Sequence, residues 1–583
     1  MATHVGKDLM HQIILRRWTA LSEQGLVNMS NLLCLPEETV LHILTLLSPP
    51  DLRSCRQTCC AINTLVATSP RLLFFLALDS LGYTLPLVPR SNLAPSGGLK
   101  LLQEHYSNWL RPNNIQPTRH SLHPHSVSSK CVGGVYAQGF GISGFLGTNA
   151  TIRDLEFYQT PSKNLGVEFK RWRLENLGLG VQDFIFDPDQ DLLVLLELPN
   201  TASPYSPTCT VHLKTMGGGE AHPRALAPTM AVNFADDAGS EGIVPNWNYH
   251  FEVMGDLVGI LFRSRSQKLP SWVMVWDWVR GVEVTRVPTG GGWNSSFVLL
   301  DQQTLLLPRS DNTHYGRPFC KRNEFGSIGV YIFDPKATAT NPPLMKASFS
   351  LPSFDRRYFL SSIKLRCTSN VRSTSRSHGR PRVYEPSLEH PLVAIDVHLS
   401  QLRGSGQITE SAGTLYVPGN VFLDSGPYSQ ETSVLHTLLN MICTRSAPEV
   451  PWHKWASHAL WVEIGDSQAK GDCLMYGYRM GTLSNIIWIT DPASGIHLLD
   501  FNHRRFKTQK AKVSRIGNSL AEKHGLRSVF SDVESPSKTK YTETVLEVEG
   551  GVGMFDEVIL DDEHVIICKG GRGAEPSLLV YTL

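Results

Sequence analysis

Acidic residues stand in two short turns of the sequence, where paired carboxylates could serve as a general acid and a general base. The residues are Asp187, Asp189, Asp191, Asp561 and Asp562. Hydrolysis would need such carboxylates, or histidines, to converge on one site. Aspartate is also common in turns for conformational reasons, because its side chain hydrogen-bonds to the nearby backbone. We therefore expect a protein without catalytic residues, and an enzyme that uses these carboxylates is the alternative.

Two other patterns lack the context that their chemistry needs. Residues 139–144 fit the dinucleotide-binding pattern G-x-G-x-x-G, but residues 145–149 do not start the helix that would hold a pyrophosphate. His120, His123 and His125 lie in a proline-rich stretch without carboxylate or cysteine partners, so rigid metal geometry is missing. The sequence thus predicts no cofactor-binding residues and no metal site.

Length, charge and cysteine usage set further limits. The 583 residues include 54 Lys and Arg against 53 Asp and Glu, and this formal net charge of +1 gives no footprint for nucleic acid. No apolar stretch approaches the roughly 18 residues that a membrane span needs. The 11 cysteines form no CxxC pair, and Cys59 and Cys60 fit an apolar helical pattern as small packed groups. We therefore expect a cytoplasmic or nuclear protein, with neither nucleic acid nor membrane as a partner.

The first hundred residues predict three short helices with clear ends. The first covers residues 36–47, since proline suits a first helical turn. The second starts with Asp51 as its N-cap and carries apolar residues at steps of three and four to residue 65. The third covers residues 71–81 and ends at Gly82. These helices hold more apolar surface than they can bury among themselves, so we expect them to bind a partner. Packing on the rest of the chain is the alternative.

The first two of these helices carry a specific pattern. It reads Leu35-Pro36-Glu37-Glu38-Thr39-Val40-Leu41-His42-Ile43-Leu44, followed by Pro50-Asp51-Leu52 and Cys55-Arg56. In order and spacing this pattern resembles the F-box, and we assign residues 31–82 to that domain. Many F-boxes have a tryptophan in the second helix where this sequence has Ile62, which keeps the apolar role with less aromatic area.

The resemblance implies a first partner. F-boxes dock on a Skp-type adaptor, which links them to a cullin scaffold and a ubiquitin-conjugating enzyme. It also implies an adaptor-binding face made of the apolar residues of the motif. These residues are Leu35, Pro36, Val40, Leu41, Ile43, Leu44, Leu52, Cys55 and Ile62.

Outside the F-box the sequence predicts three further regions. Residues 1–30 form an amphipathic helix, residues 83–130 a linker with a connecting helix at about 98–110, and residues 131–583 a large all-β domain. Short apolar runs recur in the last region as strand, acidic turn, strand, loop and strand, which is the pattern of propeller blades. We expect a degenerate, WD-like β-propeller of undetermined blade number, and an assembly of β-sandwiches is the alternative. This order of regions resembles that of a large set of fungal F-box proteins.

Three polar stretches, residues 367–391, 502–515 and 535–540, interrupt the β region, and we expect loops at all three. Residues 367–391 are rich in serine and arginine, with Arg380 and Arg382 near their end. We expect a solvated loop here, and contact with nucleic acid or an acidic substrate is the alternative.

The F-box resemblance and the β region together imply a function. We expect the substrate-recognition subunit of a Skp-cullin-F-box E3 ubiquitin ligase, in which the F-box recruits the adaptor and the β region presents a target protein. Such a chain makes no bonds itself and contributes proximity and orientation. The alternative is an F-box scaffold that acts outside ubiquitination. The sequence names no residue for target binding.

Overall fold

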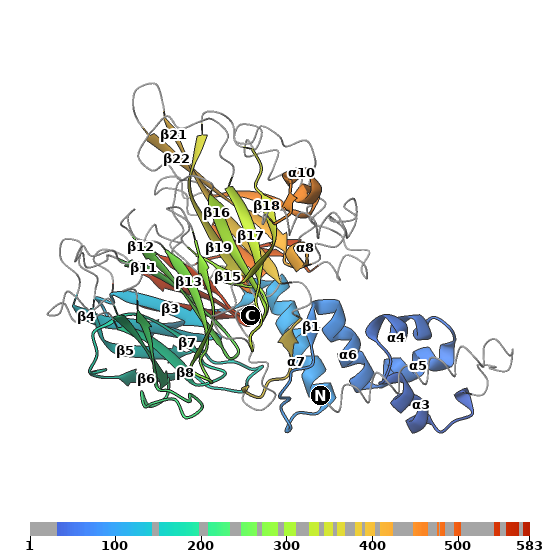
Figure 1. Ribbon diagram of the computed structural model, residues 1–583. Coiled ribbons are helices and arrows are strands. Elements are labelled where there is room, and N and C mark those ends of the chain that lie inside the picture. The colour runs from blue at the N-terminus through green and yellow to red at the C-terminus, as the bar shows by residue number, and fades with distance from the viewer. Residues whose placement is uncertain are drawn as a thin grey trace.

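The computed structural model places helices first along the chain and strands after them (Figure 1). The residues that it describes are 32–142, 151–197, 208–233, 247–264, 271–289, 296–310, 326–336, 343–353, 358–367, 379–387, 391–402, 408–423, 447–464, 475–476, 479–483, 495–502, 542–548, 556–570 and 575–583. The predicted helix of residues 1–30 lies outside them.

The F-box segment folds into short helices joined by tight connections. They are α3 (Glu37–Leu44), α4 (Pro49–Arg56), α5 (Cys60–Thr68) and α6 (Pro70–Leu81). The prediction of one second helix that starts at Asp51 is wrong. Ser48 caps α4 instead, because its side chain accepts a hydrogen bond from the Asp51 N–H at 3.4 Å. Cys59 has an extended backbone and separates α4 from α5.

The third predicted helix is confirmed as α6. It ends at Gly82, whose φ of 76° lies in the left-handed region that glycine adopts without strain. The predicted connecting helix is α7 (Pro95–Leu110), and a 3₁₀ turn, η1 (Pro112–Asn114), follows it. Among the described helices none is long and apolar enough by itself to span a membrane. The pair α5 and α6 meets that length and composition together, with a bend of 88° between them.

The first strands form an eight-stranded antiparallel sheet. A single residue pair, Ile152 with Val181, joins β5 to β7 and divides the sheet into two four-stranded halves. The first half is β3 (Ser128–Val132), β4 (Val135–Ile142), β5 (Thr151–Gln159) and β6 (Lys170–Leu174). The second half is β7 (Val181–Asp187), β8 (Leu192–Glu197), β9 (Thr208–Thr215) and β10 (Thr229–Asn233).

The next strands form two more sheets in chain order. One is β11 (Trp247–Met254), β12 (Leu257–Ser264), β13 (Trp272–Asp277) and β14 (Val282–Pro288). The other is β15 (Val298–Leu299), β16 (Thr304–Ser310), β17 (Gly326–Ile332) and β18 (Leu344–Ser350), to which β23 (Glu449–Val450) adds in parallel.

Two further sheets follow, and short helices lie beside the first of them. The first contains β19 (Tyr358–Cys367), β21 (Leu392–Leu402), β22 (Ile408–Pro418) and β24 (Leu460–Ile464), with α8 (Asn420–Leu423), α10 (Trp452–Trp455) and η2 (Ala456–His458). The second contains β25 (Met475–Tyr476), β26 (Arg479–Leu483), β27 (Gly495–Asp500) and β28 (Thr542–Glu547).

The last sheet brings distant parts of the chain together. Its consecutive strands are β29 (Glu557–Leu560), β30 (His564–Lys569) and β31 (Ser577–Thr582). Its fourth strand is β2 (Thr118–Ser121), which pairs antiparallel with β31. Part of the segment predicted as a linker is therefore an edge strand of the last sheet. A separate two-stranded pairing joins β1 (Tyr83–Thr84) to β20 (Glu385–Pro386).

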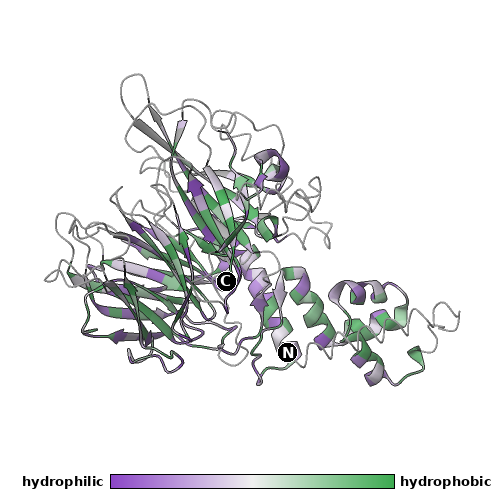
Figure 2. Cartoon of the chain, in the orientation of Figure 1, coloured by the Kyte–Doolittle hydropathy of each residue, from purple (hydrophilic) through white to green (hydrophobic). Residues whose placement is uncertain are grey.

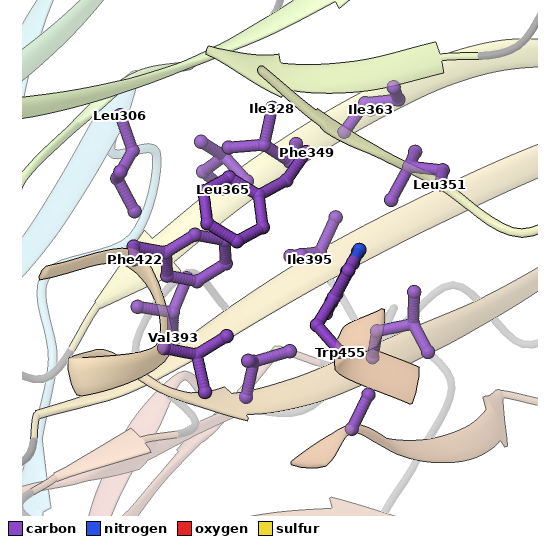
Figure 3. Packing of buried hydrophobic residues seen from close by; sticks show 14 of the residues in the cluster. Leu306, Ile328, Phe349, Leu351, Ile363, Leu365, Val393, Ile395, Phe422 and Trp455 are labelled. Carbon is purple, nitrogen blue, oxygen red and sulfur yellow. The ribbon is translucent and has the colours of Figure 1, made fainter. Parts of the chain in front are cut away.

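Each four-stranded unit shares a hydrophobic cluster with the next unit, and the last sheet shares one with the first. Figure 3 shows one of them, in which Ile328, Phe349, Ile395 and Trp455 come from different elements. In chain order, members of the shared clusters are Phe157 with Phe186, Val194 with Phe262, Val275 with Leu305, Ile328 with Ile395, Tyr416 with Leu499, Leu498 with Val565, and Tyr158 with Val580.

The expected division into a small helical F-box region and a large strand-rich region is confirmed. Figure 1 shows the helices α3 to α6 projecting from one side of the β region, with α7 between them and the strands. Among the described strands the sheets are open, and none closes into a barrel.

Candidate functional site

The F-box has its own hydrophobic core. Val40, Leu44, Leu52 and Ile62 are at most 1% exposed and pack with Val66, Leu72 and Leu76. Side chains of this size stabilise the folded state by about 1.5–3 kcal/mol each when fully buried. Four of the nine residues predicted to face the adaptor therefore hold the F-box helices together, and they offer little surface to a partner.

The other predicted residues remain accessible. Leu35 is 41% exposed and Pro36 is exposed, both at the start of α3. Leu41, Ile43 and Cys55 are half-buried and pack at the edge of the F-box core or beside it. These five accessible residues, which we call the apolar strip, are the part of the predicted set that a partner could reach.

Two apolar residues outside the prediction are also exposed, one at each end of α3. Leu33 is 40% exposed, just before α3, and Leu46 is 50% exposed, just after it. The Leu46 N–H donates to the Ile43 carbonyl at 3.0 Å, in the turn that follows α3. The signal for Leu46 was present in the sequence, since the apolar residues of 40–47 cover more than one face of a helix. Figure 2 shows hydrophobic residues, in green, in these helices.

The cysteines of the F-box are placed differently from the prediction. Cys59 stands at the N-cap of α5 and is half-buried, while Cys60 is exposed as the first residue of that helix. Burial, with the negative charge of Asp51, raises the pKa of the Cys55 thiol above its ordinary value. A thiol that stays protonated is a poor nucleophile, so Cys55 acts as a small apolar group.

A second candidate site lies where the F-box meets the β region. Residues 379–387, which we call the junction segment, come from the connection between β19 and β21 and reach the helices at the F-box side. Strand β20 in this segment pairs with β1, and the Ser387 N–H donates to the Gly82 carbonyl at 2.8 Å. The Arg382 N–H donates to the Val88 carbonyl at 3.1 Å. The junction segment is therefore tied by its backbone to the chain that follows α6.

The arginines of the junction segment are ion-paired. Arg380 donates from Nε to Asp189 at 2.9 Å, and Arg382 pairs with the other oxygen of the same carboxylate. Burial alone would raise the pKa of Asp189, but Arg382 and Arg380 outweigh burial and hold that pKa below its ordinary value. Arg382 is 8% exposed. The prediction of a solvated basic loop is wrong for this part of the segment, because its charges are neutralised inside the protein.

Asn164 holds the junction segment on the other side. Its Oδ1 accepts the N–H groups of Val383 and Tyr384, at 2.9 and 3.1 Å. Its Nδ2 donates to the Tyr384 carbonyl and to Asp562 Oδ2, both at 3.0 Å. One buried amide thus joins the loop after β5, the junction segment and the last sheet.

A buried polar cluster continues from Asp562 toward the helices. The Tyr83 hydroxyl lies 2.8 Å from His105 Nε2, receives a hydrogen bond from Arg479 Nη1 at 3.0 Å and donates to Asp562 at 3.3 Å. His105 Nδ1 lies 3.1 Å from the Leu583 carbonyl. Burial, together with Arg479, lowers the pKa of His105 well below its ordinary value, so His105 is neutral near pH 7. Burial raises the pKa of Asp562 to about 6, and Arg479 partly opposes this shift.

The carboxylates of the acidic turns accept hydrogen bonds from backbone N–H groups of the protein itself. Asp187 accepts the Asp189 N–H at 2.9 Å, and Asp561 accepts the Glu563 N–H at 2.9 Å. Asp191 accepts the Gly217 N–H at 2.8 Å. Burial, with the nearby charge of Asp189, raises the pKa of Asp187 to about 6. The geometry of these turns supports a conformational role for their carboxylates.

The turn between β29 and β30 contains two more buried ionisable groups. His564 Nδ1 lies 2.8 Å from Asp561, and this carboxylate outweighs burial and raises the pKa of His564 to about 9. Burial raises the pKa of Glu563 to about 7, and Glu563 accepts a hydrogen bond from Ser162. Only the run of polar residues at 561–564 indicates this network at the level of the sequence.

Two of the three histidines that the sequence analysis considered and rejected as metal ligands make local contacts. His120 stacks on Phe169 with ring centroids 3.9 Å apart, and His123 Nδ1 lies 2.6 Å from the Pro124 carbonyl. Within the part of the chain that the structure describes, no three His, Cys, Asp or Glu side chains are grouped to hold a metal ion.

Comparison with known proteins agrees with the helical site. Residues 32–74 match the family model of the F-box-like domain. This segment is therefore an F-box-like domain, and the chain carries that domain before its β region. No curated protein matches the chain. The resemblance to fungal F-box proteins thus stays a prediction.

Proposed function

We propose that this chain is the substrate-recognition subunit of a Skp-cullin-F-box E3 ubiquitin ligase. The observation that carries the proposal is an F-box-like domain with an accessible apolar strip, joined to a large β region by a buried polar junction. F-box domains generally bind Skp-type adaptors. A junction held by Asn164 and Asp189 keeps the β region at a fixed distance and angle from the adaptor. A target held by the β region would then meet a conjugating enzyme with little loss of orientation.

We assign the adaptor-binding role to the accessible apolar residues. Leu35, Pro36 and Ile43 come from the F-box motif, and Leu33 and Leu46 are exposed at the two ends of α3. Removing such side chains from water on binding is worth about 25 cal/mol per Å² of apolar area. The buried members of the motif act indirectly, because they fix the helices that present this surface.

We further propose that the β region is a degenerate propeller of seven blades. Seven antiparallel four-strand units can be counted among the described strands, with the eight-stranded sheet taken as two. Consecutive units share hydrophobic clusters, and the last unit shares one with the first. Strand β2 from the N-terminal side completes the C-terminal sheet, which is how a ring of blades avoids a loose end.

The proposed role is non-catalytic and belongs to the cytoplasm or nucleus. The ubiquitin transfer would be carried out by the conjugating enzyme, and the target protein would bind to the β region. The carboxylates that an enzyme would need are engaged in turns and ion pairs, as at Asp187 and Asp189.

The test is co-expression with a Skp-type adaptor, followed by size-exclusion chromatography. We expect one-to-one co-elution of the full chain with the adaptor. Leu35→Asp should abolish it, because a charge on this strip has to be desolvated on binding. Leu226→Asp is the matched control: Leu226 is 82% exposed between β9 and β10, and this variant should still co-elute.

The fold of each variant and the binding of the cullin are also measured. Circular dichroism melts of both variants should match the wild type, which shows that the F-box stays folded. A folded full chain that ignores the adaptor would overturn the proposal. A complex with the adaptor that excludes the cullin would favour the F-box scaffold that acts outside ubiquitination.

A further inference from the structure

An open cavity lies between the F-box and the β region, and we call it the junction groove. Its volume is about 260 Å³, close to the lower end of small-molecule sites, which start at roughly 300 Å³. Its walls come from α6, from residues 85–95, from the first turn of α7 and from the junction segment. Segments from the F-box side and from the β region thus line one cavity.

Most of the wall is apolar and reaches the surface. Phe74 of α6 is 8% exposed, and Phe75 beside it is half-buried. Leu85 is 56% exposed, and Val383 of the junction segment lies opposite Phe74 across Gly98, where a Cβ would come within 3.2 Å of both side chains. Apolar surface held open in this way gains free energy when an apolar group covers it.

The charged groups of the junction groove are all positive. Arg71, Arg90 and Arg382 line it, and no acidic residue does so among the described residues. The charge of Arg382 is balanced by Asp189. Arg90 donates from Nη1 to the neutral Lys163 carbonyl at 2.8 Å, which leaves its charge without a carboxylate partner.

Arg71 lies in the first turn of α6. It is exposed, and that first turn contains no acidic residue. The N–H groups at a helix N-terminus favour an anion, whereas a cation there is unfavourable without one. Arg71 and Arg90 therefore offer two uncompensated positive charges beside an apolar wall.

We propose that the junction groove binds a small amphipathic carboxylic acid. Its hydrocarbon part lies against Phe74, Phe75 and Leu85, and its carboxylate is held by Arg71 and Arg90. Guanidinium groups suit this role, because they present several N–H donors in the plane of a carboxylate. The inference does not depend on ubiquitin transfer. A bound ligand would touch both the F-box and the junction segment, so its presence would stiffen the connection between them.

The test uses the full chain and three eight-carbon probes that differ only in charge. Isothermal titration calorimetry is carried out with octanoate, octanol and octylamine. We expect octanoate to bind at least tenfold more tightly than octanol, and octylamine to bind more weakly than octanol. Equal binding of the three probes, or no binding of octanoate, would overturn the proposal.

Variants then locate the site. Arg71→Gln with Arg90→Gln should reduce the affinity for octanoate to that for octanol, and leave octanol unchanged. Arg71→Lys should retain most of the octanoate binding, because the charge is kept. Leu85→Asn should weaken octanoate and octanol alike, whereas Leu226→Asn, a matched exposed leucine elsewhere, should change neither.

The fold of each variant is checked by its thermal midpoint. Arg71 is exposed, so Arg71→Gln alone should melt with the wild type and already lower octanoate affinity severalfold. If octanoate still binds with wild-type affinity after both glutamine substitutions, its carboxylate is not held by Arg71 and Arg90, and the proposal is overturned.

Discussion

The buried charges at the junction lie in ion pairs that share one carboxylate. Asp189 faces Arg380 and Arg382, and each of the three side chains is at most 22% exposed. The attraction between such groups repays the cost of removing them from water only when the geometry is close. Removing one partner would leave an uncompensated charge inside the protein. The ion pairs therefore favour this position of the junction segment, because any other position would leave the same buried charges unpaired.

His564 makes the stability of the β region depend on pH. Its pKa of about 9 in the folded protein lies above the ordinary 6.5, so the folded state binds this proton more tightly than the unfolded state. The stabilisation is complete below pH 6.5 and is lost as the pH rises through about 9. It amounts to at most about 3.5 kcal/mol, since one pKa unit corresponds to about 1.4 kcal/mol. His564→Gln should remove this decline.

The measurement is urea unfolding of the full chain at several values between pH 6 and pH 9.5. The charges of Asp561 and Glu563 influence the pKa of His564, and the charge of His564 influences the pKa of His105. All three residues are present in the wild type and in His564→Gln. His42→Gln, at an exposed site on α3, serves as the control and should keep the wild-type slope. A wild-type slope in His564→Gln would show that His564 does not hold a proton in this range.

Among the elements, those with local signals were predicted well. Pro70 and Gly82 mark the ends of α6, and both ends of that helix are set by residues inside or next to it. Acidic turns followed by apolar runs predicted β7 with β8, and β29 with β30. In these cases the residues that fix the structure are neighbours in sequence.

The sequence did not predict elements and side chains whose contacts lie far away along the chain. Strand β2 has the sequence Thr-Arg-His-Ser, which lacks an apolar alternation, and its Thr118 meets Val580 across 462 residues. Arg380 and Arg382 were predicted in solvent because nothing nearby in the sequence compensates them, whereas Asp189 lies about 190 residues before them. The F-box motif likewise does not distinguish inward residues such as Leu52 from outward ones such as Leu35, since both are apolar.

The junction segment should open when its central amide is removed. Asn164→Leu keeps the size of the side chain and deletes its four hydrogen bonds. The Val383 N–H keeps its 3.3 Å bond to the Asn164 carbonyl, whereas the Tyr384 N–H, the Tyr384 carbonyl and Asp562 Oδ2 lose this partner. Each unsatisfied buried group costs about 1–3 kcal/mol. Amides of residues 379–387 should then exchange with deuterium at least tenfold faster, as measured by mass spectrometry of peptides.

A matched variant tests whether the effect is local. Asn113 makes a similar bridge, donating to the Val545 carbonyl at 3.1 Å and accepting the Glu547 N–H at 2.8 Å. Asn113→Leu should speed exchange at residues 545–547 and leave the junction segment unchanged. Uniformly faster exchange in Asn164→Leu would mean that the amide supports the whole fold rather than the junction.

At the scale of the whole molecule, the connection between α7 and the first sheet does two things. It carries the chain from the F-box side into the β region, and it supplies β2 to the sheet formed by the C-terminal strands. The C-terminus itself is buried: Leu583 is 3% exposed, and its carbonyl lies beside His105 of α7. Stability of the first and last sheets is therefore linked through β2 and α7, even though they lie at opposite ends of the sequence.

A proline in β2 should break this link. The Leu122 N–H donates to the Pro576 carbonyl at 2.9 Å, and hydrogen-bonded pairs alternate along antiparallel strands. His120 and Leu578, two residues along, therefore form the next hydrogen-bonded pair. His120→Pro removes that donor, because proline has no N–H group. We expect a loss of about 1–3 kcal/mol in unfolding free energy, from the missing bond and its unsatisfied partner.

The control and the readout decide whether the molecule behaves as a ring. His120→Ala keeps the N–H and loses only the ring that stacks on Phe169. In His120→Pro, but not in His120→Ala, amide exchange should rise together in β3 and in β30, which belong to different sheets that share the cluster of Tyr158 and Val580. Faster exchange confined to the C-terminal sheet would show that β2 is a simple edge strand. Faster exchange in both sheets would support the ring that we propose, since the first and last sheets meet through this cluster.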